Sequence, residues 1–443
     1  MFETLRNALK ERDIRLKILF TVLLIIVYRI GCYVPVPGLD PNTVASLMGS
    51  NEFLGILSTI TGGSMQNATL FSLGILPFIN AFIIMQLLTL VIPALSRLSK
   101  EGEEGRKKLT QITRYFAVIL AVVQAIGIVV AWKSAITNVF AFEETWKLPY
   151  MTMACIILLL VGGSIMVMWL AERITEYGIS NGSSLIIFVG IIAGSGVTFA
   201  NAIKYIIDSS SWNYIWSLIG YVIVVILVFA LIVFVDMSER RVKVQYSKQV
   251  RGNKMYGGQS TYIPIRINAG GVMPIIFASS ICMFPQMIFA LFAPNSSAYA
   301  WYAQYMGSGT AVYYIFLTIL IFFFSFFYAQ IQFNPEDVAR NIQQYGGFIP
   351  GIRAGKPTSD FLKRISNRIT LFGAFFLAVI ALIPTFLFNA LSSVFSSAVN
   401  DAPLELGGAF SATGLLIVVS VALELNKQLE SQVMMKHYKG FLK

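Results

Sequence analysis

Residues 70–92 read LFSLGILPFINAFIIMQLLTLVI, an apolar run without a charged side chain. A helix of this length, rising about 1.5 Å per residue, crosses a hydrocarbon core of about 30 Å. The run suits lipid poorly, because Gly74 and Pro77 weaken a helix and Asn80 places an amide near its centre. We therefore expect a membrane span whose polar group faces protein or a water-filled cavity.

A motif inside this run occurs a second time. GILPFI at residues 74–79 and GVMPII at residues 271–276 share the pattern Gly-x-x-Pro-x-Ile, and each opens an apolar run. Many membrane transport proteins are built from internal repeats of this kind. The recurrence predicts that the chain contains two related halves.

Composition places the chain among multi-pass membrane proteins. Hydrophobic residues make up 56% of the 443 positions and charged residues only 12%, which no soluble domain could solvate. Windows of about 20 residues predict an all-α protein with ten transmembrane helices. These spans cover residues 18–34, 70–92, 115–132, 151–171, 184–206, 215–235, 271–292, 311–331, 369–388 and 408–425.

The distribution of basic residues predicts the orientation of the chain. All of the 33 Lys and Arg except Arg29, Lys133, Lys147 and Lys204 lie in the amino-terminal segment, the even-numbered connections or the tail. By the positive-inside rule, both termini are expected in the cytoplasm. The repeated motif falls on spans two and seven, which are an odd number apart. We therefore predict two inverted five-helix halves, residues 1–210 and 211–443, around a central pore.

Two features of the first half have more than one interpretation. The connection 32–69 ends in the small-residue stretch TITGGSMQNA, which could re-enter the membrane, although its composition favours an ordinary exposed loop. Ile187 and Ile191 are four residues apart and share a helix face, as do Ile79 and Ile83. Lipid contact or core packing is the usual role of a single such isoleucine, and only a converging set would indicate more.

Two cytoplasmic connections are more basic than topology requires. In residues 236–268, apolar and polar side chains alternate before RGNK at 251–254, which predicts a basic hairpin. In residues 332–368, Asn334 is a candidate N-cap, Gly346 and Gly347 end the predicted helix, and Arg353 follows on a turn. These loops suit an acidic protein surface or RNA phosphate.

Catalytic or metal-binding chemistry lacks the necessary residues. The single histidine lies in the tail, the three cysteines have no ligand spacing, and no Asp or Glu falls near the centre of a span. Three carboxylates lie at span ends, where either snorkelling to the membrane surface or pairing with a basic neighbour suffices for each: Glu172 with Arg173, Asp236 with Arg240, and Glu424 with Lys427. We expect no enzyme, metal or cofactor.

Several motifs together resemble one known family. They are YVPVPGLD, LGILPFINAFIIMQLLT, YGISNGSSLIIFVGII, QSTYIPIRINAGGVMPIIFASS, NPEDVARN, GGFIPGIRAGKPT and TGLLIVV. Together they are similar to the SecY family, the channel-forming subunits of the Sec protein translocase, along essentially the whole chain. The resemblance implies a passive, gated pore that conducts unfolded secretory proteins and releases membrane helices laterally into the plasma membrane. The alternative from the residues alone is a secondary transporter of a small solute.

The resemblance also implies roles for individual residues. A ring of apolar side chains at the waist of the pore corresponds to Ile79, Ile83, Ile187, Ile191, Ile276 and Ile417. Polar positions along a lateral gate between spans two and seven correspond to Asn80, Gln124, Ser279 and Ser280. A re-entrant plug, about residues 57–70, includes Thr61, Gly62, Gly63, Ser64, Met65, Gln66 and Asn67, in place of the exposed loop that composition favours. A partner-docking surface includes Arg240, Arg241, Lys248, Arg251 and Arg353.

The partners implied by the resemblance supply the work of transport, since the chain has no nucleotide-binding motif. They are the motor ATPase SecA, the ribosome, small membrane subunits of the SecE and SecG type, signal peptides, nascent or unfolded polypeptides, and membrane lipid.

Overall fold

The structure is a computed structural model of the 443-residue chain. It describes residues 6, 8–49, 58, 61–137, 150–209, 212–246, 249–251, 254–256, 260–268, 270–271, 273–292, 296–307, 310–396 and 412–440.

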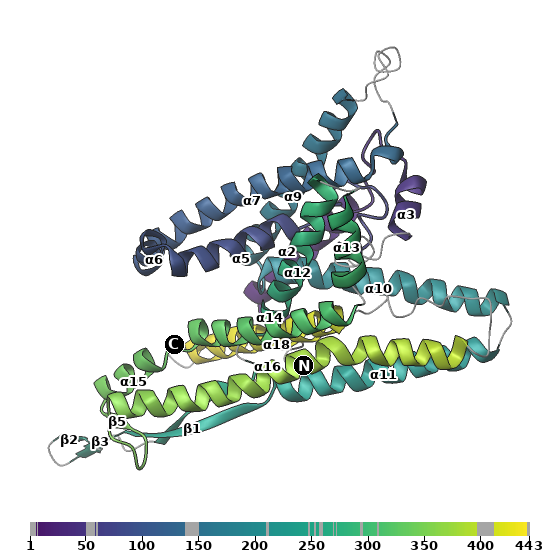
Figure 1. Cartoon of the computed structure of the whole chain (residues 1–443). Helices are drawn as coiled ribbons and strands as arrows, with labels where there is room; N and C mark the ends of the chain where they lie inside the picture. The colour runs from purple at the N-terminus through teal and green to yellow at the C-terminus, as the bar shows by residue number, and fades with distance from the viewer. Residues whose placement is uncertain are drawn as a thin grey trace.

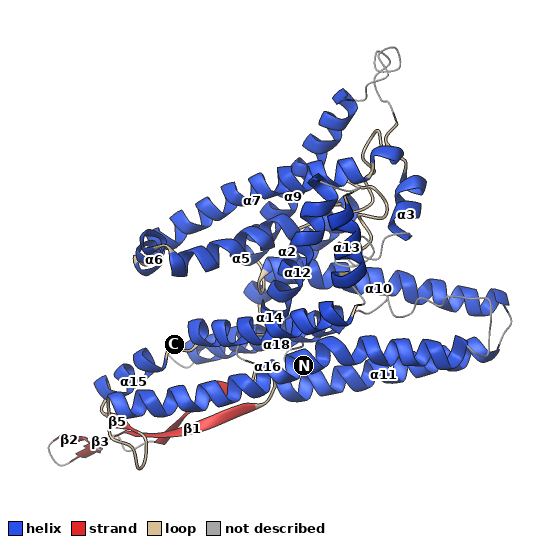
Figure 2. Cartoon of the chain, viewed as in Figure 1, coloured by secondary structure: helices blue, strands red, loops and turns tan. Residues whose placement is uncertain are grey.

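Helices make up most of the described chain (Figure 2). Before residue 210 they are α2 (Arg12–Gly31), α3 (Pro41–Gly49), α5 (Leu76–Val91), α6 (Pro93–Lys100), α7 (Glu103–Ala131), the short 3-10 helix η1 (Lys133–Ala135), α9 (Tyr150–Tyr177) and α10 (Gly182–Ser209). After it they are α11 (Trp212–Asp236), α12 (Met273–Phe292), α13 (Ser297–Met306), α14 (Ala311–Gln332), α15 (Pro335–Gln344), α16 (Lys356–Ser396) and α18 (Ala412–Gly440).

The helices form two groups, which contact each other through α10 and α12 (Figure 1). Helices α5, α7 and α9 pack together, and α11, α14, α16 and α18 form a second group. Helix α10 touches α9 of the first group and α11 and α18 of the second, while α12 packs against both α7 and α14. These two helices bring the groups into contact.

Several of the helices are long and apolar enough to cross a membrane. Among the described residues six qualify, or seven if α5 and α6 form one span that bends by 104° at their junction. They are α7, α9, α14 with α15, and parts of α10, α11 and α16. Helices α2, α12 and α18, which cover the other predicted spans, are not among them. The chain is therefore a mainly helical protein with several candidate membrane spans.

The predicted basic hairpin is confirmed, and it belongs to a larger sheet. Strand β1 (Glu239–Tyr246) pairs antiparallel with β4 (Ser260–Arg266), and β2 (Gln249–Arg251) pairs with β3 (Lys254–Tyr256) at the tip. Val242 and Val244 are buried while Arg241 and Lys243 are exposed, as the alternating pattern predicts. The fold is thus not purely α-helical, because this loop extends into strands.

The second basic connection completes that sheet. Strand β5 (Gly347–Phe348) pairs with β1, so the strand order is β4-β1-β5, with Gln245 opposite Phe348. Helix α15 precedes β5 and begins as predicted, since the side-chain oxygen of Asn334 accepts a hydrogen bond from the Glu336 N–H at 3.1 Å. The helix ends at Gln344, and Gly346, with φ +66°, follows the C-cap residue Tyr345. The two loops are one structural unit, in red beside α15 in Figure 2.

Candidate functional site

Each copy of the repeated Gly-x-x-Pro-x-Ile motif forms the start of a helix. Gly74 has φ +55° and Gly271 has φ +60°, a left-handed conformation that glycine adopts without strain. Pro77 and Pro274 are the second residues of α5 and α12, where a missing N–H breaks no helical hydrogen bond. The prediction of one helix over residues 70–92, weakened by its proline, is therefore wrong at its start. The proline helps to begin the helix.

The six isoleucines that the resemblance assigns to a ring meet in one apolar cluster. They are Ile79 and Ile83 on α5, Ile187 and Ile191 on α10, Ile276 on α12 and Ile417 on α18. Five of them are buried and Ile276 is half-buried, packed against the others' cluster. Four helices, two on each side of residue 210, thus contribute isoleucines to the same apolar cluster. Because five of the six are buried, lipid contact does not explain their positions.

Residues 61–72, which precede α5, form consecutive buried turns that we call the turn segment. Thr61, Gly62, Ser64 and Met65 are buried, Gly63 is half-buried, and Gln66 and Asn67 are exposed. The Ser64 hydroxyl lies 3.0 Å from the carbonyl oxygens of both Thr61 and Phe71. Because such short side chains bond to their own backbone, the turns satisfy their polar groups without water. The composition-based prediction of an exposed loop is wrong here.

The turn segment touches the neighbouring helices at the level of the isoleucine cluster. Gly62 lies so close to α10 that an added Cβ would be 2.8 Å from the Gly190 Cα. Gly190 lies between the two clustered isoleucines of that helix. Two residues beyond the other end of the segment, the Ser164 hydroxyl of α9 donates to the Gly74 carbonyl at 3.1 Å. The segment is therefore seated against the cluster, with contacts at one end and just beyond the other.

The four polar residues assigned to a lateral gate lie on three adjacent helices. Helix α5 packs against α7, and α7 packs against α12. On α5, the side-chain oxygen of Asn80 is buried without a hydrogen-bond partner among the described residues. Gln124 on α7 is buried, and on α12 the Ser279 hydroxyl donates to the Ile276 carbonyl at 3.0 Å, while Ser280 is half-buried. Of the polar atoms of these four residues, the Asn80 side-chain oxygen is thus a buried acceptor without a partner in the part of the chain that the structure describes.

A hydrogen bond between two further polar residues joins the two helix groups, and the sequence analysis missed it. The hydroxyl of Tyr328 on α14 donates a hydrogen bond to the side-chain oxygen of Gln86 on α5. The residues are 242 positions apart. A glutamine two turns after Pro77 in an apolar run was a visible signal, but its partner could only be found from the fold.

The sheet and the turn after it carry the described basic residues that the resemblance assigns to partner docking. Arg240 and Arg241 are exposed on β1, and Arg241 pairs with Glu239 at 2.8 Å. Arg353 is exposed on the turn after β5. Of the other two, Lys248 lies outside the described residues, and Arg251 is described only by its backbone in β2. The described part of the surface thus carries at least three exposed guanidinium groups.

Comparison with known proteins places the chain in a family. A family model described as SecY matches residues 69–426. Curated proteins named protein translocase subunit SecY are similar over 100% of both chains: 40% identical in Streptomyces galbus, 41% in Streptomyces coelicolor and 38% in Mycobacterium tuberculosis. The chain belongs to the SecY family. The resemblance predicted from the motifs is confirmed.

Solved structures share the fold of this SecY family member. A structure titled as that of a protein conducting channel is 22% identical, with a TM-score of 0.65, and covers 93% of this chain and 91% of its own. A SecY structure whose title states that its plug domain stabilises the closed channel has a TM-score of 0.64 at 22% identity. Sec61 in a canine ribosome–channel complex has a TM-score of 0.61 at 21% identity.

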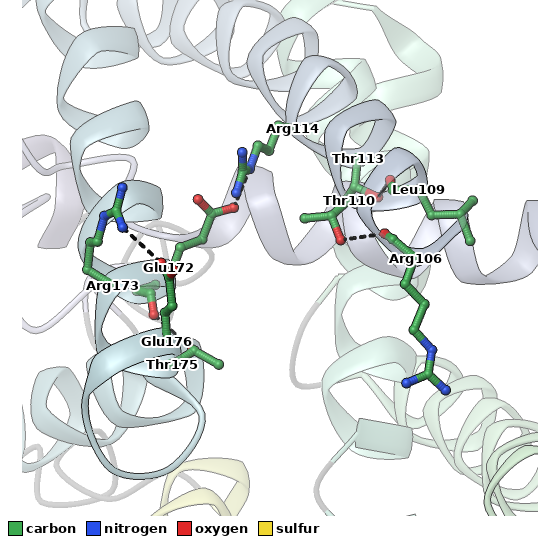
Figure 3. Close-up of polar contacts among 10 residues, drawn as sticks. Arg106, Leu109, Thr110, Thr113, Arg114, Glu172, Arg173, Thr175 and Glu176 are labelled. Atoms are coloured by element: carbon green, nitrogen blue, oxygen red, sulfur yellow. Dashed lines mark hydrogen bonds and ion pairs between the residues drawn. The ribbon is translucent and has the colours of Figure 1, made fainter. Parts of the chain in front are cut away.

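The ion pairs at the span ends differ from those predicted for this SecY family member. Glu172 pairs with Arg114 of α7 at 2.6 Å, and Arg173 pairs with Glu176 at 2.8 Å (Figure 3). Adjacent residues on a helix point in different directions, so Glu172 does not pair with Arg173, which was one of the two alternatives that the sequence left open. The observed pair instead ties α9 to α7.

The other two carboxylates also have different partners. Asp236 accepts a hydrogen bond from the Asn268 side chain at 3.0 Å, and Glu424 accepts one from Gln428 at 3.3 Å. Asn268 follows β4, so the Asp236 contact joins the end of α11 to the sheet. The polar contacts at the helix ends therefore act between elements as well as within one helix.

Proposed function

We propose that this chain is the central subunit of a protein-conducting channel in the bacterial plasma membrane. It translocates unfolded secretory proteins and releases membrane helices laterally into lipid. The channel is a passive gated pore and not an enzyme, so a translating ribosome or the SecA ATPase drives transport. The translocase names of its full-length relatives support this function over a small-solute transporter.

One observation carries the proposal: isoleucines of four helices belong to one apolar cluster, and the turn segment is seated against α10 beside two of them. An apolar constriction resists wetting and so blocks ions. Its side chains can part around an extended polypeptide without requiring particular chemistry from it. The isoleucine cluster thus serves as the pore ring, and the turn segment, with Gly62 against α10, serves as the plug that closes it.

The topology we propose has ten transmembrane helices in two inverted five-helix halves, residues 1–210 and 211–443. The repeated helix start at α5 and α12 supports it, because the same glycine and proline occur at corresponding places in both halves. Both termini lie in the cytoplasm, as the distribution of basic residues indicates. The sheet then lies on the cytoplasmic side.

The gate and the docking surface follow from this topology. Helices α5 and α12 flank a lateral gate, whose polar residues exchange weak interhelical hydrogen bonds for contacts with a signal peptide. The sheet, with its exposed Arg240, Arg241 and Arg353, docks the ribosome or SecA. Solved relatives titled as ribosome-bound channels support a ribosome partner. Small subunits of the SecE and SecG type complete the complex.

Cross-linking tests whether a polypeptide passes through the ring. Cys32, Cys155 and Cys282 are replaced by serine and one cysteine is placed at Ile79. A secretory precursor with a single cysteine, arrested at different lengths, is then oxidised mildly in the membrane. A disulfide that depends on the arrest position places the precursor in the ring.

The absence of any disulfide between the precursor and Ile79 would refute the proposal. If no precursor position links to Ile79, while a control cysteine at Arg353 does link, the chain docks precursors without conducting them. A solute carrier would give neither disulfide, and it would bind a small substrate in the absence of precursor. The three functions are thus separated by one set of samples.

A further inference from the structure

The contact between Tyr328 and Gln86 joins two helices that lie far apart in sequence. Tyr328 lies on α14 and is 7% exposed, and Gln86 lies on α5 and is half-buried. Helices α5 and α14 are otherwise linked mainly through α7 and α12, since α5 packs on α7, α7 on α12, and α12 on α14. The hydrogen bond links the first and the last of these four helices, α5 and α14, directly.

Tyr328 also contacts the other helix of the gate. Its ring packs against Phe277 of α12, with the ring centroids 5.0 Å apart at an angle of 61°. A Cβ added at Gly270, just before α12, would lie 3.2 Å from the Tyr328 Cβ. Because the tyrosine is packed closely against α12, any movement of α14 that pulls its hydroxyl from Gln86 also moves α12 relative to α5.

The position of Tyr328 within α14 connects it to the sheet. The helix ends at Gln332, about one turn beyond the tyrosine, and Asn334 caps α15 directly afterwards. Phe333, between the two helices, packs against the apolar cluster under the sheet, which includes Val242 and Val244 of β1. A displacement of the sheet is thus transmitted to the last turn of α14 through a short, packed connection.

We propose that the Tyr328 hydroxyl and the Gln86 side chain form a latch that holds the lateral gate closed, and that a partner docked on the sheet releases it. The latch rests on the proposed function, because it assigns a regulator to that gate. A single hydrogen bond suits such a role. In the membrane it stabilises one state only modestly, so a docked partner or a signal helix can displace it.

The latch makes a quantitative prediction for two conservative variants. Tyr328→Phe removes the donor and keeps the ring against Phe277, and Gln86→Leu removes the acceptor at similar volume. Each variant should raise the open population about threefold, the size expected for one interhelical hydrogen bond. Since both break the same bond, the double variant should open no further than either single variant. Tyr150→Phe, an exposed tyrosine at the start of α9, is the matched control.

The experiment measures the gate directly and transport separately. Spin labels at Leu87 on α5 and Ile281 on α12, in full-length protein without its native cysteines, report the distance between the two helices by pulsed resonance. The same variants are assayed for transport of one precursor with an intact signal sequence and one with a weakened signal. We expect a longer-distance population in both single variants and a gain in transport of the weakened precursor alone.

The outcomes separate the latch from the proposed function. If wild type transports the intact precursor but Tyr328→Phe has the wild-type distance distribution, the latch is refuted and the channel stands. If the increase in open population in the double variant is the sum of the two single increases, the latch is also refuted, because the two residues then act independently. If wild type transports neither precursor, the proposed function fails, and the distance distribution alone tells whether the bond restrains α5 relative to α12.

Discussion

The Arg29 guanidinium donates a hydrogen bond to the Gly62 carbonyl oxygen, with Nη1 3.4 Å from the oxygen. Arg29 lies in the last turn of α2, inside the first predicted span, where it is a charged exception to an apolar run. Its guanidinium also lies over the Tyr33 ring, 5.6 Å from the centroid. A cation in such a segment normally marks a function, because its burial in lipid is costly. Here it binds the backbone of the turn segment.

Removal of this donor should loosen the turn segment. Arg29→Leu deletes the hydrogen bond and leaves the Gly62 carbonyl with one partner fewer, a loss of roughly 1 kcal/mol or about a fivefold shift. We expect faster labelling of a single cysteine placed at Met65 by a membrane-impermeant maleimide. Arg15→Leu, at an exposed site nearer the start of α2, should label at the wild-type rate. Equal labelling in both variants would show that Arg29 does not hold the segment.

Gly62 and Gly63 form a matched pair for testing the seat of the segment. Both have positive φ, +67° and +82°, so alanine at either costs about 1–2 kcal/mol of backbone strain. Only at Gly62 does the added Cβ also meet backbone, 2.8 Å from the Gly190 Cα, whereas at Gly63 it meets nothing within 4 Å. Gly62→Ala should therefore raise resting ion conductance in bilayers well above Gly63→Ala. Similar conductance in the two variants would place the segment elsewhere.

How much of the fold could be predicted from the sequence depends on the range of the interaction. Alternation in β1, the cap at Asn334 and the turn at Gly346 are local, and each was predicted. The pairing of β1 with β5 was not, because nothing in Gly347–Phe348 specifies a partner a hundred residues earlier. The bend between α5 and α6 was also missed. A proline at Pro93 signals a helix boundary, but not its angle.

For the candidate site, the sequence indicated which residues belong to it better than it indicated their burial and their hydrogen-bond partners. The resemblance assigned six isoleucines to a pore ring, and all six belong to the large apolar core cluster of the structure. Composition alone misjudged the turn segment, since serine and threonine suit exposed loops and also suit buried turns whose hydroxyls bond to nearby carbonyls, as Ser64 does. The partner of Gln86 could not be predicted, because a hydrogen bond between α5 and α14 exists only after folding.

Polar substitution in the isoleucine cluster should make the constriction wet. Ile83 is 3% exposed, and an asparagine there buries an amide at a cost of about 1–3 kcal/mol unless water enters to solvate it. Ile83→Asn and Ile276→Asn should each raise resting ion conductance in reconstituted bilayers, while Ile83→Leu should not. An unchanged leak in both asparagine variants would count against the pore ring.

Acid should weaken the start of α3. The Thr43 hydroxyl, and then the Asn42 N–H at 3.2 Å from Asp40 Oδ1, hold the pKa of the Asp40 carboxyl below its ordinary value of 3.8. A carboxyl whose pKa is lower in the folded state stabilises it above the unfolded pKa, and this contribution is lost as pH falls through the folded pKa. Amide protection factors across α3 should drop below that point. In Asp40→Asn, which caps without titrating, protection should not depend on pH in this range.

Charge reversal at Arg353 should uncouple the channel from its driving partner. The side chain is exposed on a turn bounded by Gly351 and Gly355, both with positive φ, so the turn itself does not require arginine. Arg353→Glu should lower partner-driven transport by at least tenfold, about 1.4 kcal/mol or more, as expected when a charge faces an oppositely charged docking site. Arg353→Lys should retain most of the activity because it keeps the charge. Membrane insertion and thermal stability should equal those of wild type in both variants. Loss of folded protein in Arg353→Glu would instead assign the arginine a structural role in the turn.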